Sequence, residues 1–113
     1  MSALRFHELT VKRVSPEAAG SVAVTFAIPA DTRDTFKFQP GQFLTLRAKV
    51  NGEEVRRTYS ISSPRSRLAK AGELEIGIRP VEGGVFSNWA AQTLKAGDKL
   101  DVMPPDGRFV VKK

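Results

Sequence analysis

Hydrophobic and polar residues alternate along several segments of the chain. In the segment 21–28, apolar residues stand at Val22, Val24, Phe26 and Ile28, with small or polar residues between them. A period of two places successive side chains on opposite faces of a strand, so that one face packs inward and the other meets solvent. Similar alternation recurs in five further segments: 6–14, 44–50, 55–62, 74–79 and 100–102. The pattern predicts six half-buried antiparallel strands.

Turn residues separate these strands. Asn51-Gly52 tolerates the positive φ angles of a type I′ turn and predicts a hairpin between 44–50 and 55–62. Pro40-Gly41 suits the centre of a type II turn, and the segments 95–98 and 104–107 have turn compositions. The turns and strands together favour one antiparallel sheet.

Only one segment has a helical pattern. After Gly83-Gly84, Ser87 is a candidate N-cap for a helix of about two turns over 88–94. Six short strands and one short helix predict an all-β fold, a six-stranded antiparallel Greek-key barrel, because closure removes exposed sheet edges. A β-sandwich is the alternative architecture. No linker divides residues 1–113, so we expect a single domain.

Length and composition exclude several classes of protein. A chain of 113 residues buries somewhat more than ~60% of its unfolded surface, enough for one core. Its apolar stretches fall far short of the ~20 residues of a membrane span, so we expect a cytoplasmic location. The absence of cysteine excludes disulfides and iron–sulfur ligands on this chain, and the single histidine, His7, disfavours a metal site. We interpret His7 as an exposed strand residue.

The chain is basic, with 18 Lys and Arg against 12 Asp and Glu and a net charge of +6. This charge favours an anionic ligand or partner. Five cations gather within 15 positions: Arg56, Arg57, Arg65, Arg67 and Lys70. We interpret 65–70 as a solvated loop in the first instance.

Two segments carry candidate binding chemistry. On a strand, Arg57 and Tyr59 share a face, which places a fixed cation beside a flat ring. Gly83-Gly84 allows close backbone approach, and a following helix start directs amide groups at an anion. Together they favour a cofactor with phosphate and an aromatic ring. The residues alone leave open a basic barrel for single-stranded nucleic acid, or a docking domain without a ligand.

The order of several motifs is more specific than any one of them. They are Pro40-Gly41-Gln42-Phe43, Arg57-Thr58-Tyr59-Ser60, the strand 75–79, Gly84-Val85-Phe86-Ser87-Asn88 and the closing segment 97–109. In this order the chain resembles the flavin-binding domain of the ferredoxin–NADP⁺ reductase superfamily.

The resemblance implies FAD, in preference to FMN, in an electron-transfer oxidoreductase. It assigns Arg57 to cofactor phosphate, Tyr59 to packing on the isoalloxazine ring and Ser60 to a position near flavin N5, so Tyr59 and Ser60 are the residues nearest the chemistry. Thr58 belongs to the same motif. By the same comparison, Gly77, Ile78 and Arg79 line the flavin through backbone and side chains, and Gly84, Val85, Phe86 and Ser87 bind the pyrophosphate.

Strict alternation places Ser60 on the face opposite Tyr59. Both can reach one flavin only if the ring lies across the strand end or the backbone bends before 62–64, and we expect such a bend.

The resemblance also implies partners. They are a nicotinamide-binding domain and an iron–sulfur or oxygenase electron acceptor, with no nucleic acid and no membrane. No motif for either further domain is found, so we expect a flavin module that binds FAD weakly and does not oxidise NAD(P)H efficiently alone. Self-association through the face left exposed is a further expectation.

Overall fold

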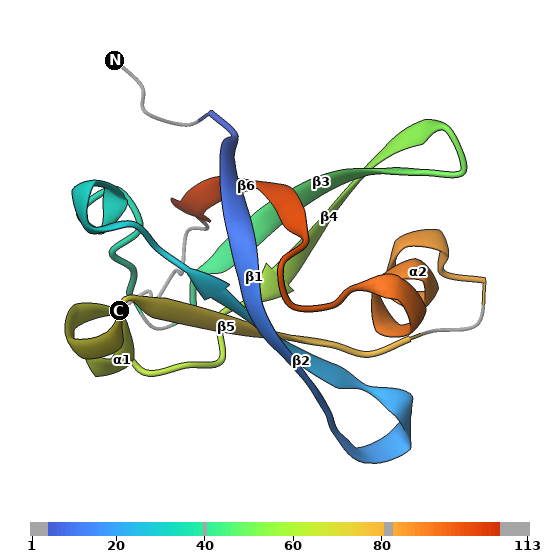
Figure 1. Cartoon of the computed structure of the whole chain (residues 1–113), viewed down its shortest axis with the longest axis horizontal. Helices are drawn as coiled ribbons and strands as arrows, with labels where there is room; N and C mark the ends of the chain where they lie inside the picture. Colours follow the sequence, from blue (N-terminus) through green and yellow to red (C-terminus); the bar gives the residue numbers. More distant parts are fainter. Residues whose placement is uncertain (1–4, 40, 81–82, 107–113) are drawn as a thin grey trace, which may run out of the picture.

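Six antiparallel strands form the body of the protein in a computed structural model that describes residues 5–39, 41–80 and 83–106. The strands are β1 (His7–Pro16), β2 (Val22–Ala27), β3 (Phe43–Val50), β4 (Glu53–Ser60), β5 (Glu73–Ile78) and β6 (Lys99–Asp106). Their order in the sheet is β4-β3-β6-β1-β2-β5, so the last strand lies between β3 and β1 (Figure 1).

The two edge strands of this sheet meet through a short seam. Ile61, just after β4, forms an isolated bridge with Ile76 of β5, and the Ser62 amide donates to the Glu75 carbonyl at 2.8 Å. This seam brings β4 and β5 together and nearly closes the barrel. The predicted six-stranded Greek-key barrel is confirmed.

The inward faces of the strands supply the core. Phe26, Leu44, Ile76 and Val102 are completely buried. β2 departs from the half-buried pattern, because Thr25 on its other face is also buried, at 1% exposure. The Thr25 hydroxyl lies 3.4 Å from a Glu75 carboxylate oxygen, so polar side chains of the neighbouring strand cover this face.

The β3–β4 hairpin has the predicted turn. Asn51 and Gly52 have φ angles of 55° and 84°, and Val50 pairs with Glu53 across the two-residue loop. The predicted turn at 95–98 is also present, since the Asp98 amide donates to the Lys95 carbonyl at 3.1 Å. Gly41 has a φ of 94°, as its predicted turn requires, and Pro40 lies outside the described residues.

The prediction of a single helix is wrong. The described part of the chain has two α-helices, α1 (Arg65–Ala71) and α2 (Val85–Thr93), and two 3₁₀ turns, η1 (Ala18–Gly20) and η2 (Ala30–Thr32). α1 occupies the segment that we interpreted as a loop. It ends where Gly72, at φ 68°, donates its amide to the Leu68 carbonyl, and Leu68 anchors it in the core.

α2 begins three residues earlier than predicted. Its N-cap is Gly84, whose carbonyl accepts from both the Asn88 amide and the Asn88 side chain. Ser87 is therefore buried within the first turn and is not the N-cap.

The turn predicted over 104–107 is wrong for its described part, because Pro104, Pro105 and Asp106 continue β6. Among the described residues, this stretch of β6 pairs with β3 alone, and the register shifts between Phe43 and Thr45. A strand with one free side tolerates proline, which lacks an amide donor. Gly107 lies outside the described residues.

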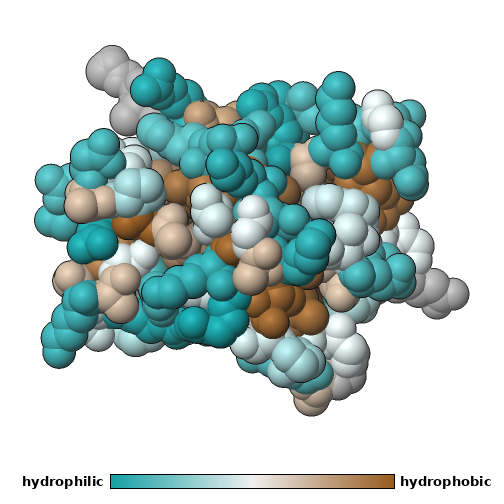
Figure 2. Space-filling model, viewed as in Figure 1, coloured by the Kyte–Doolittle hydropathy of each residue, from teal (hydrophilic) through white to brown (hydrophobic). Residues whose placement is uncertain are grey.

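His7 is not an exposed strand residue as predicted. Its ring packs edge-on against Phe36, with ring centroids 5.5 Å apart, and its Nε2 is buried without a hydrogen-bond partner in the described structure. Elsewhere, hydrophilic residues cover most of the face in Figure 2, and hydrophobic residues show in small separate areas. None of the described helices is long and apolar enough to span a bilayer.

Candidate functional site

A groove of about 200 Å³ lies where β4, the end of β5 and the start of α2 come together. The seam brings the two strands to this place, and α2 follows β5 in the chain. Seven of the described residues line the groove, and all seven are predicted site residues: Arg57, Thr58, Tyr59, Arg79, Gly84, Phe86 and Ser87. The fold thus brings together residues from three elements that the sequence analysis singled out separately.

Tyr59 forms the aromatic wall of the groove. On β4 it pairs with Leu44, and Arg57 pairs with Leu46, so both side chains lie on one face of the strand. The Tyr59 ring lies 5.9 Å from the ring of Phe86, which is completely buried. Burial raises the pKa of the Tyr59 phenol, and the Arg57 charge opposes this effect. The groove therefore offers a supported, neutral ring that is still partly exposed.

The cations of the groove lack carboxylate partners. Neither Arg57 nor Arg79 forms a salt bridge with any described residue, and none of the described residues that line the groove is acidic. Other arginines do pair with carboxylates: Arg13, Arg47, Arg56 and Arg67. Arg57 donates from Nη1 to the Arg56 carbonyl at 2.7 Å, which holds its guanidinium near the strand. Uncompensated positive charge beside a ring favours an anionic aromatic ligand.

The start of α2 forms the remaining wall. Gly84 is the N-cap, with φ −80° and ψ 112°, and Val85 and Phe86 follow it as the first helical residues. Amides of a first helical turn point out of the N-terminal end and, with the helix dipole, favour a phosphate. This anion-binding geometry stands beside Arg57 and Tyr59 in one groove.

Comparison with known proteins identifies the family of the domain. Residues 8–111 match the protein family described as the oxidoreductase FAD-binding domain. The chain belongs to this family. The resemblance inferred from the sequence is confirmed, and so is FAD as the cofactor of the domain.

Two curated relatives and one solved structure illustrate the likeness. A component of the 1,2-phenylacetyl-CoA epoxidase from Escherichia coli K12 is 44% identical over 104 residues, which are 92% of this chain and 28% of that protein. The ferredoxin reductase component of 3-ketosteroid-9-alpha-monooxygenase from Rhodococcus rhodochrous is 38% identical over 106 residues, 92% of this chain and 29% of that protein. A ferredoxin NADP⁺ reductase from Neisseria gonorrhoeae, solved with FAD and NADP, aligns with a TM-score of 0.74 at 21% identity, over 93% of this chain and 39% of that one.

This FAD-binding domain thus spans less than a third of either curated relative. The structural likeness supports the barrel fold.

Four predicted site residues lie outside the groove lining: Ser60, Gly77, Ile78 and Val85. Ser60 is exposed on the opposite face of β4. It is the last residue of β4 that pairs with β3, and the next residue, Ile61, forms the bridge to β5 at the seam. Ile78 is completely buried, backbone and side chain alike. The role of Ile78 in lining the flavin stays a prediction. Val85 is 48% exposed.

Gly77 leaves an open space on the outside of β5. A Cβ atom built there meets no heavy atom within 4 Å. Glycine in a strand interior is costly unless another group approaches closely, so the space is suited to a ligand ring beside the strand.

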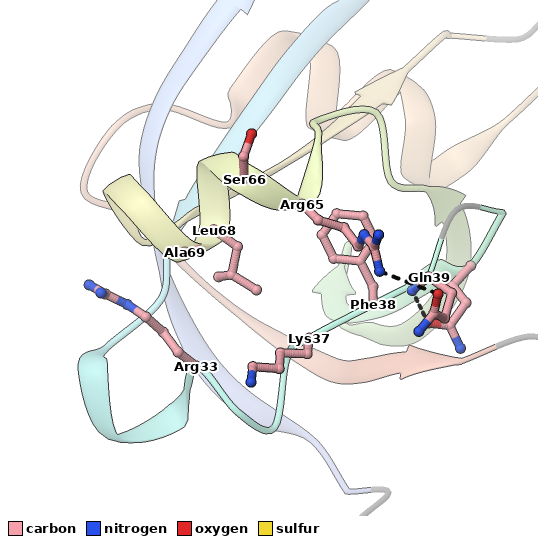
Figure 3. A pocket seen from close by; sticks show the side chains of 9 residues that line it. Arg33, Lys37, Phe38, Gln39, Arg65, Ser66, Leu68 and Ala69 are labelled. Atoms are coloured by element: carbon pink, nitrogen blue, oxygen red, sulfur yellow. Dashed lines mark hydrogen bonds between the residues drawn. The ribbon is translucent and has the colours of Figure 1, made fainter.

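A larger hollow, of about 450 Å³, lies elsewhere in the domain, between α1 and residues 33–42 (Figure 3). It contains none of the predicted flavin residues. This hollow could not be predicted from the sequence, because its lining comes from a helix and a loop that have no periodic pattern of apolar residues. The only signal was the basic cluster at 65–70.

Proposed function

We propose that this domain binds FAD in the groove between β4, Arg79 and the start of α2, as the flavin-binding part of an NAD(P)H-dependent electron-transfer oxidoreductase. The observation that carries the proposal is the convergence of Arg57, Tyr59 and the Gly84 helix start on one groove. No single motif would suffice, because each also occurs in chains without a flavin.

The residues present fit the cofactor. A dinucleotide phosphate needs uncompensated cations and amide donors, which Arg57, Arg79 and the first turn of α2 supply. A flavin ring needs a flat apolar contact, which the Tyr59 ring supplies with Phe86 behind it. The open space at Gly77 allows the ring to extend past β5.

Each residue then has a distinct task. When bound, FAD supplies the redox chemistry, taking a hydride and releasing electrons singly. Arg57, Arg79 and the residues Gly84, Val85, Phe86 and Ser87 hold the phosphates. Tyr59 packs on the ring and excludes water from one side, while Thr58 and Gly77 shape its edge next to the buried Ile78. Ser60, at the end of β4, is proposed to hydrogen-bond near N5.

The partners of the electron transfer are also proposed. A nicotinamide-binding domain supplies the hydride, and an iron–sulfur or oxygenase protein receives the electrons. The names of the two curated relatives, a component of an epoxidase and a ferredoxin reductase component of a monooxygenase, support this choice. An oxygenase of the phenylacetyl-CoA epoxidase type is the first acceptor to test. Single-stranded nucleic acid has no such support.

The decisive experiment compares two neighbouring arginines. Arg57→Ala removes a charge-assisted hydrogen bond worth ~1.5–3 kcal/mol and should weaken FAD binding roughly ten- to a hundredfold. Arg56→Ala removes the same charge from the next residue, which pairs with Glu54 at 2.9 Å and does not line the groove. FAD affinity is measured by calorimetry and by the flavin absorbance of the complex.

Arg56→Ala should bind FAD within a factor of about two of the unchanged protein, since the net charge alone is altered. An equal loss of FAD affinity in the two variants would show that non-specific electrostatic attraction, and not the groove, holds the cofactor. FMN, which lacks the adenylate half, should bind more weakly than FAD. If the unchanged domain binds neither flavin, the proposal fails.

A further inference from the structure

The larger hollow combines an apolar floor with a basic rim. Its volume of about 450 Å³ falls within the roughly 300–1,000 Å³ of small-molecule sites. Nine residues line it: Arg33, Lys37, Phe38, Gln39, Gln42, Arg65, Ser66, Leu68 and Ala69. Figure 3 shows Leu68 pointing from α1 into the hollow, with Arg33 and Arg65 at opposite ends.

The floor is suited to an apolar body. Phe38 and Leu68 are 6% and 4% exposed, so they present the surface of the core at the bottom of the hollow. Ala69 stands beside them and is exposed. The small side chain of Ala69 leaves room for a ligand above the floor.

The rim is suited to an anion. Among the described residues, three cations line the hollow, Arg33, Lys37 and Arg65, and no carboxylate does. Arg33 and Arg65 form no salt bridge with any residue that the structure describes. Lys37 lies 3.3 Å from Asp34, but both side chains are largely exposed, so this pair compensates little charge.

Two of these cations are held in place. The Arg33 Nε donates to the Ile28 carbonyl at 3.3 Å, and its guanidinium lies over Gly72, where a Cβ atom would come within 2.3 Å of it. Arg65 donates to the Gln39 side chain at 3.4 Å, a long bond that leaves its other N–H groups for a ligand.

Arg65 is the best placed to meet an anionic head. It stands three and four residues before Leu68 and Ala69 on α1, so the three side chains share one helix face. A head bound by Arg65 therefore lies directly beside the apolar floor.

We propose that this hollow binds an organic anion with a flat apolar body, whose body packs on Phe38, Leu68 and Ala69 and whose carboxylate, sulfonate or phosphate pairs with Arg65. Arg33 and Lys37 add positive potential without being the primary contact. The site is separate from the flavin groove, because the two share no lining residue.

The test uses two dyes as probes. Anilinonaphthalene sulfonate has an aromatic body and an anionic head, and phenylnaphthylamine has the same body without the head. Each is titrated by calorimetry into the domain in the presence of saturating FAD. The sulfonate should bind with one-to-one stoichiometry, and the uncharged dye should bind at least about tenfold more weakly, the value of one charge-assisted hydrogen bond.

Three variants locate the bound dye. Arg65→Gln should weaken sulfonate binding about tenfold and leave the uncharged dye unchanged. Lys70→Gln makes the same charge change on the same helix but outside the hollow, and should change neither. Ala69→Trp fills the hollow from an exposed helix position and should abolish binding of both dyes.

Several results would overturn the proposal. They are equal binding of the two dyes, equal losses in Arg65→Gln and Lys70→Gln, undiminished binding in Ala69→Trp, or displacement of the sulfonate by FAD. FAD titration of the same variants should give unchanged affinity, while Arg57→Ala should weaken FAD and not the dye. A domain that fails to bind FAD would still report on this hollow, so the two proposals fail separately.

Discussion

At the residue scale, the flavin groove is distinguished by arginines that have no carboxylate partner among the described residues. Arg47 and Arg67 are used structurally, since each pairs with a carboxylate of another element. Arg57 and Arg79 have no such partner among the described residues and remain hydrated at an exposed surface, which costs little. A dinucleotide can therefore pair with them without breaking an existing ion pair.

Gly77 gives a prediction at this scale. Its Cβ position faces open space and its φ angle is not positive, so Gly77→Val fits β5 without strain. Because glycine within a strand costs roughly 0.5–1 kcal/mol relative to alanine, the melting temperature should stay equal or rise. The added methyl groups occupy the space assigned to the flavin, so FAD affinity should fall at least about tenfold, which is ~1.4 kcal/mol.

The series Gly77→Ala, Gly77→Val is measured by FAD calorimetry and thermal unfolding. Alanine should give an intermediate affinity, because its single methyl group takes less of the space. A valine variant that is stable and binds FAD like the unchanged domain would show that no ring lies against this strand.

The sequence predicted site residues best where one strand fixes their relative position. Arg57 and Tyr59 share a face because a strand has a period of two, whatever its neighbours do. The sequence is less informative for Ile78, which is completely buried, because the resemblance assigns a role to a residue but does not say how exposed that residue is. The position of Ser60 depends on where the chain stops pairing with β3 and begins to bridge to β5. No local sequence pattern specifies that point.

At the element scale, a single carboxylate joins three elements. Glu73 of β5 is 7% exposed and accepts from Lys12 of β1 at 2.6 Å and from Arg67 of α1 at 2.8 Å, with Arg13 at 3.4 Å. These contacts attach α1 to the outside of the barrel beside β2. Hydrogen bonds from Lys12 and Arg67 lower the pKa of Glu73 from 4.5 to about 2.

This cluster predicts a defined acid sensitivity. A carboxyl whose pKa is lower in the folded than in the unfolded state stabilises the fold above pH 4.5, and this contribution disappears as the pH falls from 4.5 to about 2. Glu73→Gln should lower the free energy of unfolding at neutral pH by about 1.5–3 kcal/mol, the value of hydrogen bonds to a charged group. Urea unfolding at several pH values measures this difference.

The difference between the two proteins should shrink steadily as the pH is lowered through this interval. Glu54→Gln, which removes the exposed partner of Arg56, is the control and should cost less than about 1 kcal/mol at any pH. A Glu73→Gln penalty that does not depend on pH would mean that packing, and not the carboxylate charge, holds the cluster together.

The elements that the sequence missed are those fixed by distant contacts. α1 has one buried apolar residue, Leu68, so no helical period appears, and Arg67 is held by Glu73 of the next strand. Pro104 and Pro105 indicated a turn, yet they extend β6 because that strand pairs on one side only there. The strands and the β3–β4 hairpin could be predicted because their signals are local.

At the scale of the whole molecule, the flavin groove spans the weakest join of the barrel. Its walls stand on β4, which carries Arg57 and Tyr59, and at the end of β5, followed by Arg79 and α2. These two strands are held together by the Ile61–Ile76 bridge, whereas β2 pairs with a strand along each side. Opening the seam therefore separates the two walls of the groove.

This arrangement predicts that FAD protects the seam. Without FAD, the Ser62 and Glu75 amides, which donate across the seam to the Glu75 carbonyl and the Ser63 hydroxyl, should exchange hydrogen with solvent through local opening, faster than the amides of β2. FAD binds only when both walls are in place, so at a concentration of about 100 times Kd it should slow exchange at these two amides by up to about a hundredfold, equivalent to ~2.7 kcal/mol. Amide exchange followed by NMR, with and without FAD, measures both effects. If the seam already exchanges as slowly as β2 without the cofactor, or if FAD slows every amide except those of the seam, the seam does not control access to the groove.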